Sequence, residues 1–598
     1  MQDNRSHLKT LPVPPLGETL PTLRHAVSAV VDAETLAATD RAIEDFQANQ
    51  GPALQTELEA FAADRDAADS SWLADRWLRD YLTVRTPLQT TTNVGFQINL
   101  HTETTGLDRA VDIVRALAAV HLQQADGSMP EEVDGRGNPI DANQWLCFNG
   151  ALRIPRPECD EVTFSERGSE SRSIGVIVRG HIFDLRITDE QGRLASREQL
   201  HATLRNLRAG ATADANTHAN PHATSALDTR LSYLGSAALA ALSFSDDTLA
   251  ILRDQLFGLH LVDDAQASDA TLLCNLTFQP GHAWVYKPLT YEINLASNFV
   301  AMHVEHSTVD GATLVEAMRR VQEAVDNDAP TAANADADAT PADVTPLELS
   351  PVARVDGSSA APESAPEPAS APAGDEYAVE IIEVPKLAKE ELPFKFSADA
   401  MSQLILCIAQ QLTFGRIRAV YEAVDMREYK AGRTECLRAV TPEAVAFSKK
   451  LATAAEAGEG AGAGTEQPTV ENLQAALNAH RNWVIGCKTG RGIDRHLWAL
   501  SFTAEKQFGA PLALLEDPGV KAARTDFLST TSIGSDAHII RYVFAPTIPN
   551  GFGVNYTPKA TSIEYCLTFD RTKAEQPEQF QANLTRAAEL LADFLRRL

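Results

Sequence analysis

A histidine at the end of a strand-like run is the sharpest chemical feature of this sequence. Asp310 follows His306 by four residues, at the start of a helical pattern, in the segment Met302-His303-Val304-Glu305-His306-Ser307-Thr308-Val309-Asp310-Gly311. An imidazole titrates near neutral pH, so at a strand end facing a cavity it can act as a general base toward a hydroxyl or a thiol. The pattern alone is also typical of structural histidines. His303 falls on the opposite face of the strand, where we expect a core or surface residue.

The C-terminal half supplies hydroxyl groups and arginines in short, separated motifs. Tyr421 stands thirteen residues before Thr434, and three further segments follow: Ile493-Asp494-Arg495-His496-Leu497, Leu528-Ser529-Thr530-Thr531-Ser532 and Pro549-Asn550-Gly551-Phe552-Gly553-Val554-Asn555-Tyr556. Nothing in the chain resembles a GxSxG nucleophile elbow. A Ser-Thr run by itself is typical of an ordinary turn.

Helical and strand-like patterns interleave around these motifs, which predicts a mixed α/β protein. Helical periodicity predicts helices over Glu34–Asn49, Gly106–Gln124, Asp247–Leu259, Thr313–Val325, Asp399–Thr413, Val470–Ile485 and 580–598. Runs of β-formers predict strands over Ser173–Val178, His181–Ile187, Leu289–Leu295, Asn298–Glu305, His538–Phe544 and Ser562–Phe569.

Charge and cysteine usage exclude several classes of protein. The 598 residues include 52 Lys+Arg and 81 Asp+Glu, a net charge of −29, which argues against a nucleic acid or an anionic membrane as partner. Residues 326–376 hold eleven acidic residues against Arg354 alone, and we predict a disordered linker there. Seven scattered cysteines without a CxxC pair indicate reduced thiols and no metal site. With no targeting or membrane segment, we expect a cytoplasmic protein.

Taken in order, the motifs resemble those of the choline/carnitine O-acyltransferase family. The resemblance covers nearly the whole chain apart from the acidic linker, and it includes four earlier segments: Leu11-Pro12-Val13-Pro14-Pro15-Leu16, Ser71-Trp72-Leu73, Arg153-Ile154-Pro155 and Lys287-Pro288-Leu289. Many separate motifs in the right order rarely coincide by chance.

The resemblance implies an α/β fold of two similar, chloramphenicol-acetyltransferase-like halves with mixed sheets covered by helices and a central tunnel. The N-terminal segment 1–92 would pack with the C-terminal half. Residues 93–325 would form the N-terminal half that carries the histidine, and 377–598 the C-terminal half. The linker 326–376 falls near the join, where an insertion does least harm.

The same resemblance makes His306 the general base for direct transfer between a CoA thioester and an acceptor hydroxyl. Thr531, at the last position of the family's Ser-Thr-Ser motif, would donate to the oxyanion, a contact worth about 2.7–4 kcal/mol in enzymes of this kind. Asp310 would pair with Arg495. The alternative for that pair is a purely structural buried ion pair.

The acceptor pocket resembles that of carnitine enzymes. Arg495 matches the arginine that carnitine enzymes use and choline enzymes replace, and Tyr421, Thr434 and Ser529 match the donors to the carnitine carboxylate. Phe544 matches an aromatic residue that would face the trimethylammonium group, although a strand Phe is commonly core.

The acyl and CoA sites are marked by fewer residues. Tyr542 falls where short-chain members carry a bulky residue and long-chain members carry glycine, which favours a short acyl group. Lys389 and Lys395 are the candidates for the CoA 3′-phosphate, with solvated surface lysines as the alternative. Ser532 replaces the family glutamine after the Ser-Thr motif.

We therefore expect a monomeric, CoA-dependent carnitine O-acyltransferase with no permanent cofactor and no metal. Its substrates would be acyl-CoA and carnitine. The alternatives are a choline or other-acceptor transferase of the same family, and a non-catalytic descendant that binds acyl-CoA.

Overall fold

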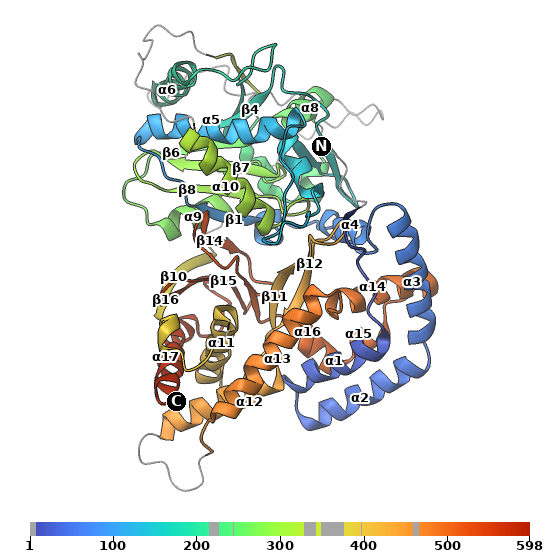
Figure 1. The fold of residues 1–598 in the computed structure, drawn as a ribbon. Helices are drawn as coiled ribbons and strands as arrows, with labels where there is room; N and C mark the ends of the chain where they lie inside the picture. The colour runs from blue at the N-terminus through green and yellow to red at the C-terminus, as the bar shows by residue number, and fades with distance from the viewer. Residues whose placement is uncertain are drawn as a thin grey trace.

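The structure is a computed structural model that describes residues 7–213, 227–242, 244–327, 342–347, 376–395, 397–457 and 466–598. Two large mixed β-sheets, each covered by helices, make up most of the molecule (Figure 1). This confirms the predicted mixed α/β class. Among the described residues, every helix is too short or too polar to cross a lipid bilayer.

The first sheet has eight strands in the order β14-β1-β8-β7-β6-β4-β5-β9. In chain order they are β1 (Val94–Ile98), β4 (Ser173–Val178), β5 (His181–Arg186), β6 (Gly258–Val262), β7 (Leu289–Asn294), β8 (Val300–Val304), β9 (Val344–Pro346) and β14 (Ile539–Phe544). One face packs on α5 (Gly106–Ala125), α6 (Arg197–Ala213) and α10 (Gly311–Asn327), and α9 (Asp269–Phe278) covers part of the other. Every residue of β7 and β8 is buried, as expected for central strands that are covered on both faces.

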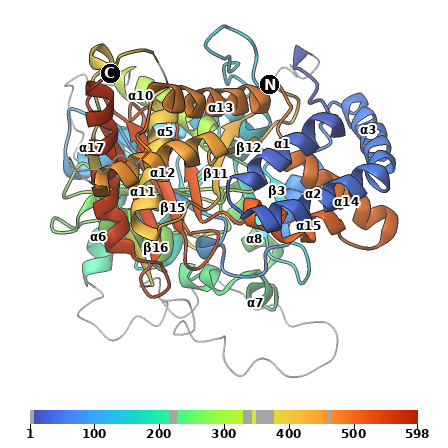
Figure 2. The ribbon, with the colours of Figure 1, turned by 90° about the horizontal axis from the view of Figure 1, so that it is seen from below.

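The second sheet has six strands in the order β10-β16-β15-β13-β11-β12. They are β10 (Tyr377–Pro385), β11 (Val420–Asp425), β12 (Thr434–Arg438), β13 (Leu528–Thr531), β15 (Phe552–Pro558) and β16 (Ser562–Asp570). Its helical cover comprises α11 (Ala398–Phe414), α12 (Pro442–Ala457), α13 (Val470–Lys488) and α17 (Pro577–Arg596), which Figure 2 shows from below.

The N-terminal helices pack against the second half of the chain. These helices are α1 (Leu16–Ser28), α2 (Ala33–Ala48), α3 (Gly51–Ala67) and α4 (Ala74–Leu82). They share one core with α14 (Asp494–Phe508) and α16 (Pro518–Arg524), and lie beside both in Figure 1. Inside this core the ring of His496 bridges Thr19 and Gln55, with contacts of 2.8 and 2.9 Å.

One strand crosses between the halves. β14 lies in the C-terminal part of the sequence but pairs antiparallel with β1 at the edge of the first sheet. On the side away from β1 it contacts the second sheet, where Tyr542 N donates to Asn555 Oδ1 at 3.2 Å and Arg541 pairs with Glu564. β14 therefore joins the two sheets, and it presents Tyr542 and Phe544 to the space between them.

The predicted helix Asp247–Leu259 is wrong in its last third. The helix α8 (Asp246–Asp254) ends early, and the apolar residues after Gln255 lead into β6, buried between β4 and β7. A short apolar run has no period that separates a buried strand from a helix, so the sheet decides. The smaller elements are α7 (Ser236–Ala240), α15 (Ala513–Glu516) and the hairpin of β2 (Ala151–Ile154) and β3 (Glu161–Phe164).

Part of the predicted linker is an ordered strand. Within 326–376, Val344–Pro346 forms β9 on the edge of β5, and Leu347 is buried against the neighbouring core. Leu347 also exchanges backbone hydrogen bonds with Ile182 and Leu227. Asp326 and Asn327 belong to the end of α10. Most of the remaining linker, 328–341 and 348–375, lies outside the described residues.

Candidate active site

A cavity of about 480 Å³ lies where the two sheets and the N-terminal helices meet. Its walls come from α4, β1, the start of α10, strands β11 to β14 and α14. Ten of the residues singled out in the sequence line it: His306, Asp310, Tyr421, Thr434, Arg495, Ser529, Thr531, Ser532, Tyr542 and Phe544.

His306 follows the last residue of β8 by two positions and is half-buried at the cavity. Its Nδ1 lies 2.7 Å from the carbonyl oxygen of Val309. A carbonyl can only accept, so Nδ1 carries the proton and Nε2 keeps its lone pair. The ring of Tyr81 packs edge-on against the imidazole, at a centroid distance of 5.8 Å. This arrangement can accept a proton at Nε2.

Asp310 pairs with Arg433, and the predicted pairing with Arg495 is wrong. Arg433 Nε and Nη2 donate to the two carboxylate oxygens at 2.6 and 2.9 Å. The same guanidinium donates to the carbonyls of Ser307 (2.6 Å) and His306 (3.0 Å). Burial alone would raise the pKa of Asp310, but Arg433 outweighs it and lowers that pKa. Asp310 Oδ1 lies 3.7 Å from His306 Nδ1, beyond hydrogen-bond distance. The Asp310–Arg433 pair therefore holds the turn around His306 and Ser307, and Asp310 makes no direct hydrogen bond to the His306 ring.

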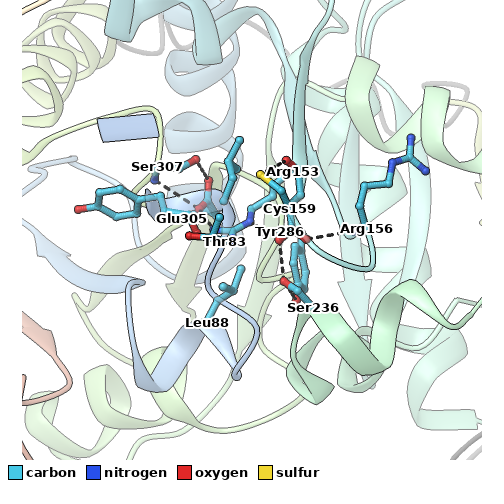
Figure 3. Close-up of polar contacts among 12 residues, drawn as sticks. Thr83, Leu88, Arg153, Arg156, Cys159, Ser236, Tyr286, Glu305 and Ser307 are labelled. Carbon is cyan, nitrogen blue, oxygen red and sulfur yellow. Dashed lines mark hydrogen bonds and ion pairs between the residues drawn. The ribbon is translucent and has the colours of Figure 1, made fainter. Parts of the chain in front are cut away.

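A second buried network supports the turn from behind. Figure 3 shows Arg153 pointing toward Glu305, beside Ser307. Arg153 Nη1 donates to Glu305 Oε1 at 3.0 Å, and Ser307 Oγ donates to Glu305 Oε2 at 2.6 Å. Arg153 also donates to Asp160 and to the carbonyl of Tyr81. The Arg153-Ile154-Pro155 motif therefore ties the residues on both sides of His306 to the helix that carries Tyr81.

Arg495 occupies the opposite wall with two of the predicted hydroxyl partners. Its Nε donates to the Thr434 carbonyl at 2.9 Å, and its Nη2 donates to Tyr421 Oη at 3.0 Å and to Thr434 Oγ1 at 3.4 Å. The guanidinium lies 4.6 Å from the centre of the Trp77 ring. Ser529 stands beside Tyr421 in the parallel register of β13 and β11. Tyr421, Ser529, Thr434 and Arg495 therefore form one cationic, hydroxyl-rich wall.

A buried carboxyl group adjoins that wall. Glu435 Oε1 accepts from the backbone N–H groups of Cys436 (2.7 Å) and Arg495 (3.3 Å). Burial raises the pKa of Glu435 to about 7; Arg495 opposes the rise and Asp494 adds to it. The raised pKa favours the neutral acid, so Glu435 offsets the charge of Arg495 less than an ordinary glutamate would.

The hydroxyl groups of β13 alternate between two faces, as strand geometry requires. Ser529 and Thr531 face the cavity, whereas Thr530 Oγ1 donates to the Tyr421 carbonyl at 2.7 Å. Thr531 Oγ1 lies 2.8 Å from Tyr542 Oη. The Tyr542 ring stacks on Phe96 with centroids 4.8 Å apart, which fills the space next to Thr531.

The candidate CoA residues are less closely grouped. Ser532 lines the cavity and accepts from the N–H of Gly534 at 3.1 Å. Lys395 is exposed just before α11. Lys389 begins a 3₁₀ turn, η7 (Lys389–Glu391), and its side chain lies outside the described part of the chain.

Sequence reasoning missed the aromatic residues of α4. Trp77 lies against both Arg433 and Arg495, and Tyr81 against His306. The sequence contained an indication of their role, because both residues follow Ser71-Trp72-Leu73 on one short helix whose apolar face must be buried. Arg433 was visible in the Gly432-Arg433-Thr434 motif but was given no role.

Comparison with known proteins decides the family. The family described as Choline/Carnitine o-acyltransferase matches residues 11–586. The chain belongs to the choline/carnitine O-acyltransferase family. It is therefore an enzyme of the CoA-dependent acyltransferase class, as the motifs indicated.

Curated relatives of this acyltransferase act on more than one acceptor. It is 22% identical to carnitine O-acetyltransferase of Homo sapiens, over 95% of this chain and 90% of the relative. It is 24% identical to the mitochondrial carnitine O-palmitoyltransferase 2 of Bos taurus, over 92% and 86%. The choline O-acetyltransferase of Danio rerio is 30% identical over 30% of this chain and 27% of its own length.

Solved structures resemble the acyltransferase more distantly. Trichothecene 15-O-acetyltransferase of Fusarium sporotrichioides aligns with a TM-score of 0.40 at 8% identity, covering 88% of this chain and 93% of its own. The wax ester synthase/diacylglycerol acyltransferase of Marinobacter aquaeolei aligns with a TM-score of 0.31 at 8% identity, covering 88% and 98%.

The buried carboxyl of Glu435 makes a prediction about stability. Between pH 4.5 and about 7 the folded protein keeps a proton that the unfolded chain loses, so the group's contribution to stability falls as pH rises. In the wild type this group should lower the free energy of unfolding by about 3 kcal/mol as the pH rises across this window. We expect Glu435→Gln, which cannot titrate, to lack this decrease. Urea denaturation at pH 5 and pH 8 measures it, with the exposed Glu380→Gln as control. Equal pH dependence of Glu435→Gln and wild type would contradict the assignment.

Proposed function

We propose that the enzyme is a carnitine O-acyltransferase that moves a short acyl group reversibly between CoA and the hydroxyl of carnitine. The observation that carries the proposal is the wall formed by Arg495, Tyr421, Thr434 and Ser529, which lines the same cavity as His306. A cation with hydroxyl groups around it suits a carboxylate that must lose its water.

His306 is the proposed general base. Its Nε2 takes the proton of the carnitine hydroxyl while that oxygen attacks the thioester carbonyl carbon. The tetrahedral intermediate then collapses with cleavage of the C–S bond, and the CoA sulfur receives the proton back from the imidazolium. The Val309 carbonyl, which holds Nδ1–H at 2.7 Å, supports this assignment because it keeps Nε2 available in both directions. The thioester is already activated, so no acyl-enzyme is needed.

Thr531 is the proposed donor to the oxyanion. When Tyr542 Oη donates to Thr531 Oγ1, the hydroxyl proton of Thr531 is left for the developing negative charge. Burial raises the pKa of Tyr542, so its phenol stays protonated and remains a donor. The backbone of Thr531 is held in turn by Asn555, whose amide donates to its carbonyl at 3.3 Å.

The proposed acceptor position has two ends. At one end Arg495 and its hydroxyl partners bind the carboxylate of carnitine, and the raised pKa of Glu435 lessens the negative charge that stands against Arg495. At the other end Phe544, which lines the cavity, offers an aromatic face to the trimethylammonium group.

Tyr542 supports the proposal of a short acyl group. Its ring is 5% exposed and stacked on Phe96, so it occupies the region behind Thr531 where a long acyl chain would have to pass. Acetyl and other small acyl groups fit in front of it.

The remaining assignments are proposals that rest on the family resemblance. Lys389, Lys395 and Ser532 would contact CoA, which would enter through a tunnel between the halves. We also propose the domain limits 1–92, 93–325 and 377–598, a monomeric state and a cytoplasmic location.

The first test follows thiol release from acetyl-CoA with a chromogenic thiol reagent, with carnitine and choline added in parallel. We expect release with carnitine, and we expect His306→Ala to lower kcat by about 10²–10⁴-fold while CoA binding is kept. His201→Ala, which alters a histidine on α6, is the control. Thiol release with choline and not with carnitine would show that choline, and not carnitine, is the acceptor. A folded wild type that binds CoA but transfers acetyl to neither acceptor would contradict the proposal and direct the search to longer acyl chains and other acceptors.

Arg495→Asn tests the carboxylate assignment. Loss of a charge-assisted contact in a desolvated site costs roughly 2 kcal/mol or more, so we expect the KM for carnitine to rise by at least about 30-fold. The response to choline, which has no carboxylate, should be unchanged or improved. Steady-state kinetics with both acceptors measures this effect. Unchanged carnitine kinetics would show that Arg495 does not bind the carboxylate.

Tyr542→Gly tests the acyl limit. We expect the variant to gain activity on a long-chain acyl-CoA relative to acetyl-CoA, because the ring no longer fills the space beside Phe96. Tyr542→Phe is the matched control: it keeps the ring but removes the hydroxyl that contacts Thr531, so it should lose rate without accepting longer chains. A chain-length profile for Tyr542→Gly like that of the wild type would show that another residue limits the acyl group.

A further inference from the structure

Two histidines and a glutamate converge in the first sheet, away from the cavity. Glu292 lies on β7, and His260 lies directly beside it on β6. His282 belongs to the loop between α9 and β7. The Nδ1 atoms of His260 and His282 lie 2.8 and 2.6 Å from one atom, Glu292 Oε2. The two imidazole rings meet edge to face, with centroids 4.9 Å apart.

The polar groups around this cluster are not fully paired within the described protein. The side chain of Glu292 is completely buried, and its second oxygen, Oε1, has no hydrogen-bond partner among the described residues. His303 shares this face of the sheet, since it stands opposite Thr290, two residues before Glu292. Both ring nitrogens of His303 and the Thr290 hydroxyl also lack a partner there. Native cores rarely leave so many buried polar atoms unpaired without a bound ion or water.

We infer that His260, His282 and Glu292 form a binding site for a divalent transition-metal ion, with Zn²⁺ as the best match. Imidazole nitrogen and carboxylate oxygen are the ligand set that zinc takes in proteins. The three donor atoms already lie within 4.8 Å of one another.

Only a small rearrangement is needed to admit the ion. Bonds of about 2.0–2.1 Å at tetrahedral angles place ligand atoms roughly 3.3–3.4 Å apart, so the carboxylate must withdraw by roughly half an ångström or turn Oε1 toward the ion. The histidine side chains are 14% and 20% exposed, which leaves an approach from solvent for the ion and for a fourth, water ligand. His260 also lines a surface cavity of about 510 Å³.

The position of the site points to a structural role. Glu292 is in register with Ala301 on β8, five residues before His306, a span of roughly 16 Å along a strand. The ion would join β6, β7 and the loop that runs from His282 to Pro288. That loop holds the end of β8, because the Pro288 carbonyl accepts from Glu305 N at 3.0 Å. The ion would therefore stabilise the frame behind His306 without touching the reacting groups.

The test titrates Zn²⁺ into the full-length, chelator-treated protein by calorimetry. We expect one tight site in the wild type, binding at least about 10-fold weaker in His282→Ala and Glu292→Gln, and unchanged binding in His201→Ala. His282 lies in a loop and is partly exposed, so this variant should fold even if Glu292→Gln does not. Zn²⁺ should raise the Tm of the wild type and of His201→Ala but not that of His282→Ala.

Cobalt gives an independent readout. Co²⁺ in the wild type should show the visible absorption of a four- or five-coordinate ion, and His282→Ala should show none. Absence of tight binding in the wild type would overturn the inference and leave a buried His-Glu-His hydrogen-bonded cluster. Equal Zn²⁺ affinity in the wild type, His282→Ala and His201→Ala would overturn it as well. None of these readouts depends on acyl transfer, so they stand apart from the proposed function.

Discussion

A buried ion pair joins the two halves of the molecule at the cavity. Asp310 belongs to the first half and Arg433 to the second, and the guanidinium also binds the carbonyls of His306 and Ser307. A buried pair of this kind contributes little net stability, but loss of one partner leaves an uncompensated charge and costs about 3–5 kcal/mol. The position of the His306 turn relative to β12, and therefore to Thr434 and Arg495, depends on this contact.

The sequence indicated the hydroxyl residues of the cavity better than it indicated the ion pairs around it. Ser529 and Thr531 were recognised through the match to the family's Ser-Thr-Ser motif, because the sequence by itself predicted only a turn there. The strand β13 then explains why Thr530, between them, points its hydroxyl to the Tyr421 carbonyl. The partner of Asp310 could not be recognised in this way. Two arginines, Arg433 and Arg495, follow in neighbouring motifs and both lie against Trp77, and only the path of the loop before β12 decides which one reaches the carboxylate.

The same contrast holds for the fold. Long amphipathic segments such as α5 and α10 were predicted nearly to their ends, because one face of each must be buried. Several strands were missed, among them β6 and β9, because short segments of mixed composition become strands only when a neighbouring edge is present to pair with them. The cluster around Glu292 was also invisible, because its ligands are 10 and 32 residues away from the carboxylate and contain no cysteine.

The placement of β14 has a consequence for the way the chain acquires its structure. The first sheet is complete only when residues 539–544 have reached the edge of β1, although the other strands of that sheet end by residue 346. During synthesis the outer edge of β1 therefore stays unpaired, and open to pairing with other chains, until residues 539–544 have left the ribosome. Such a late, long-range closure makes folding slow and dependent on protection of that edge. Because of it, the first sheet takes one of its strands from the second half of the chain, although each half has its own sheet and helices.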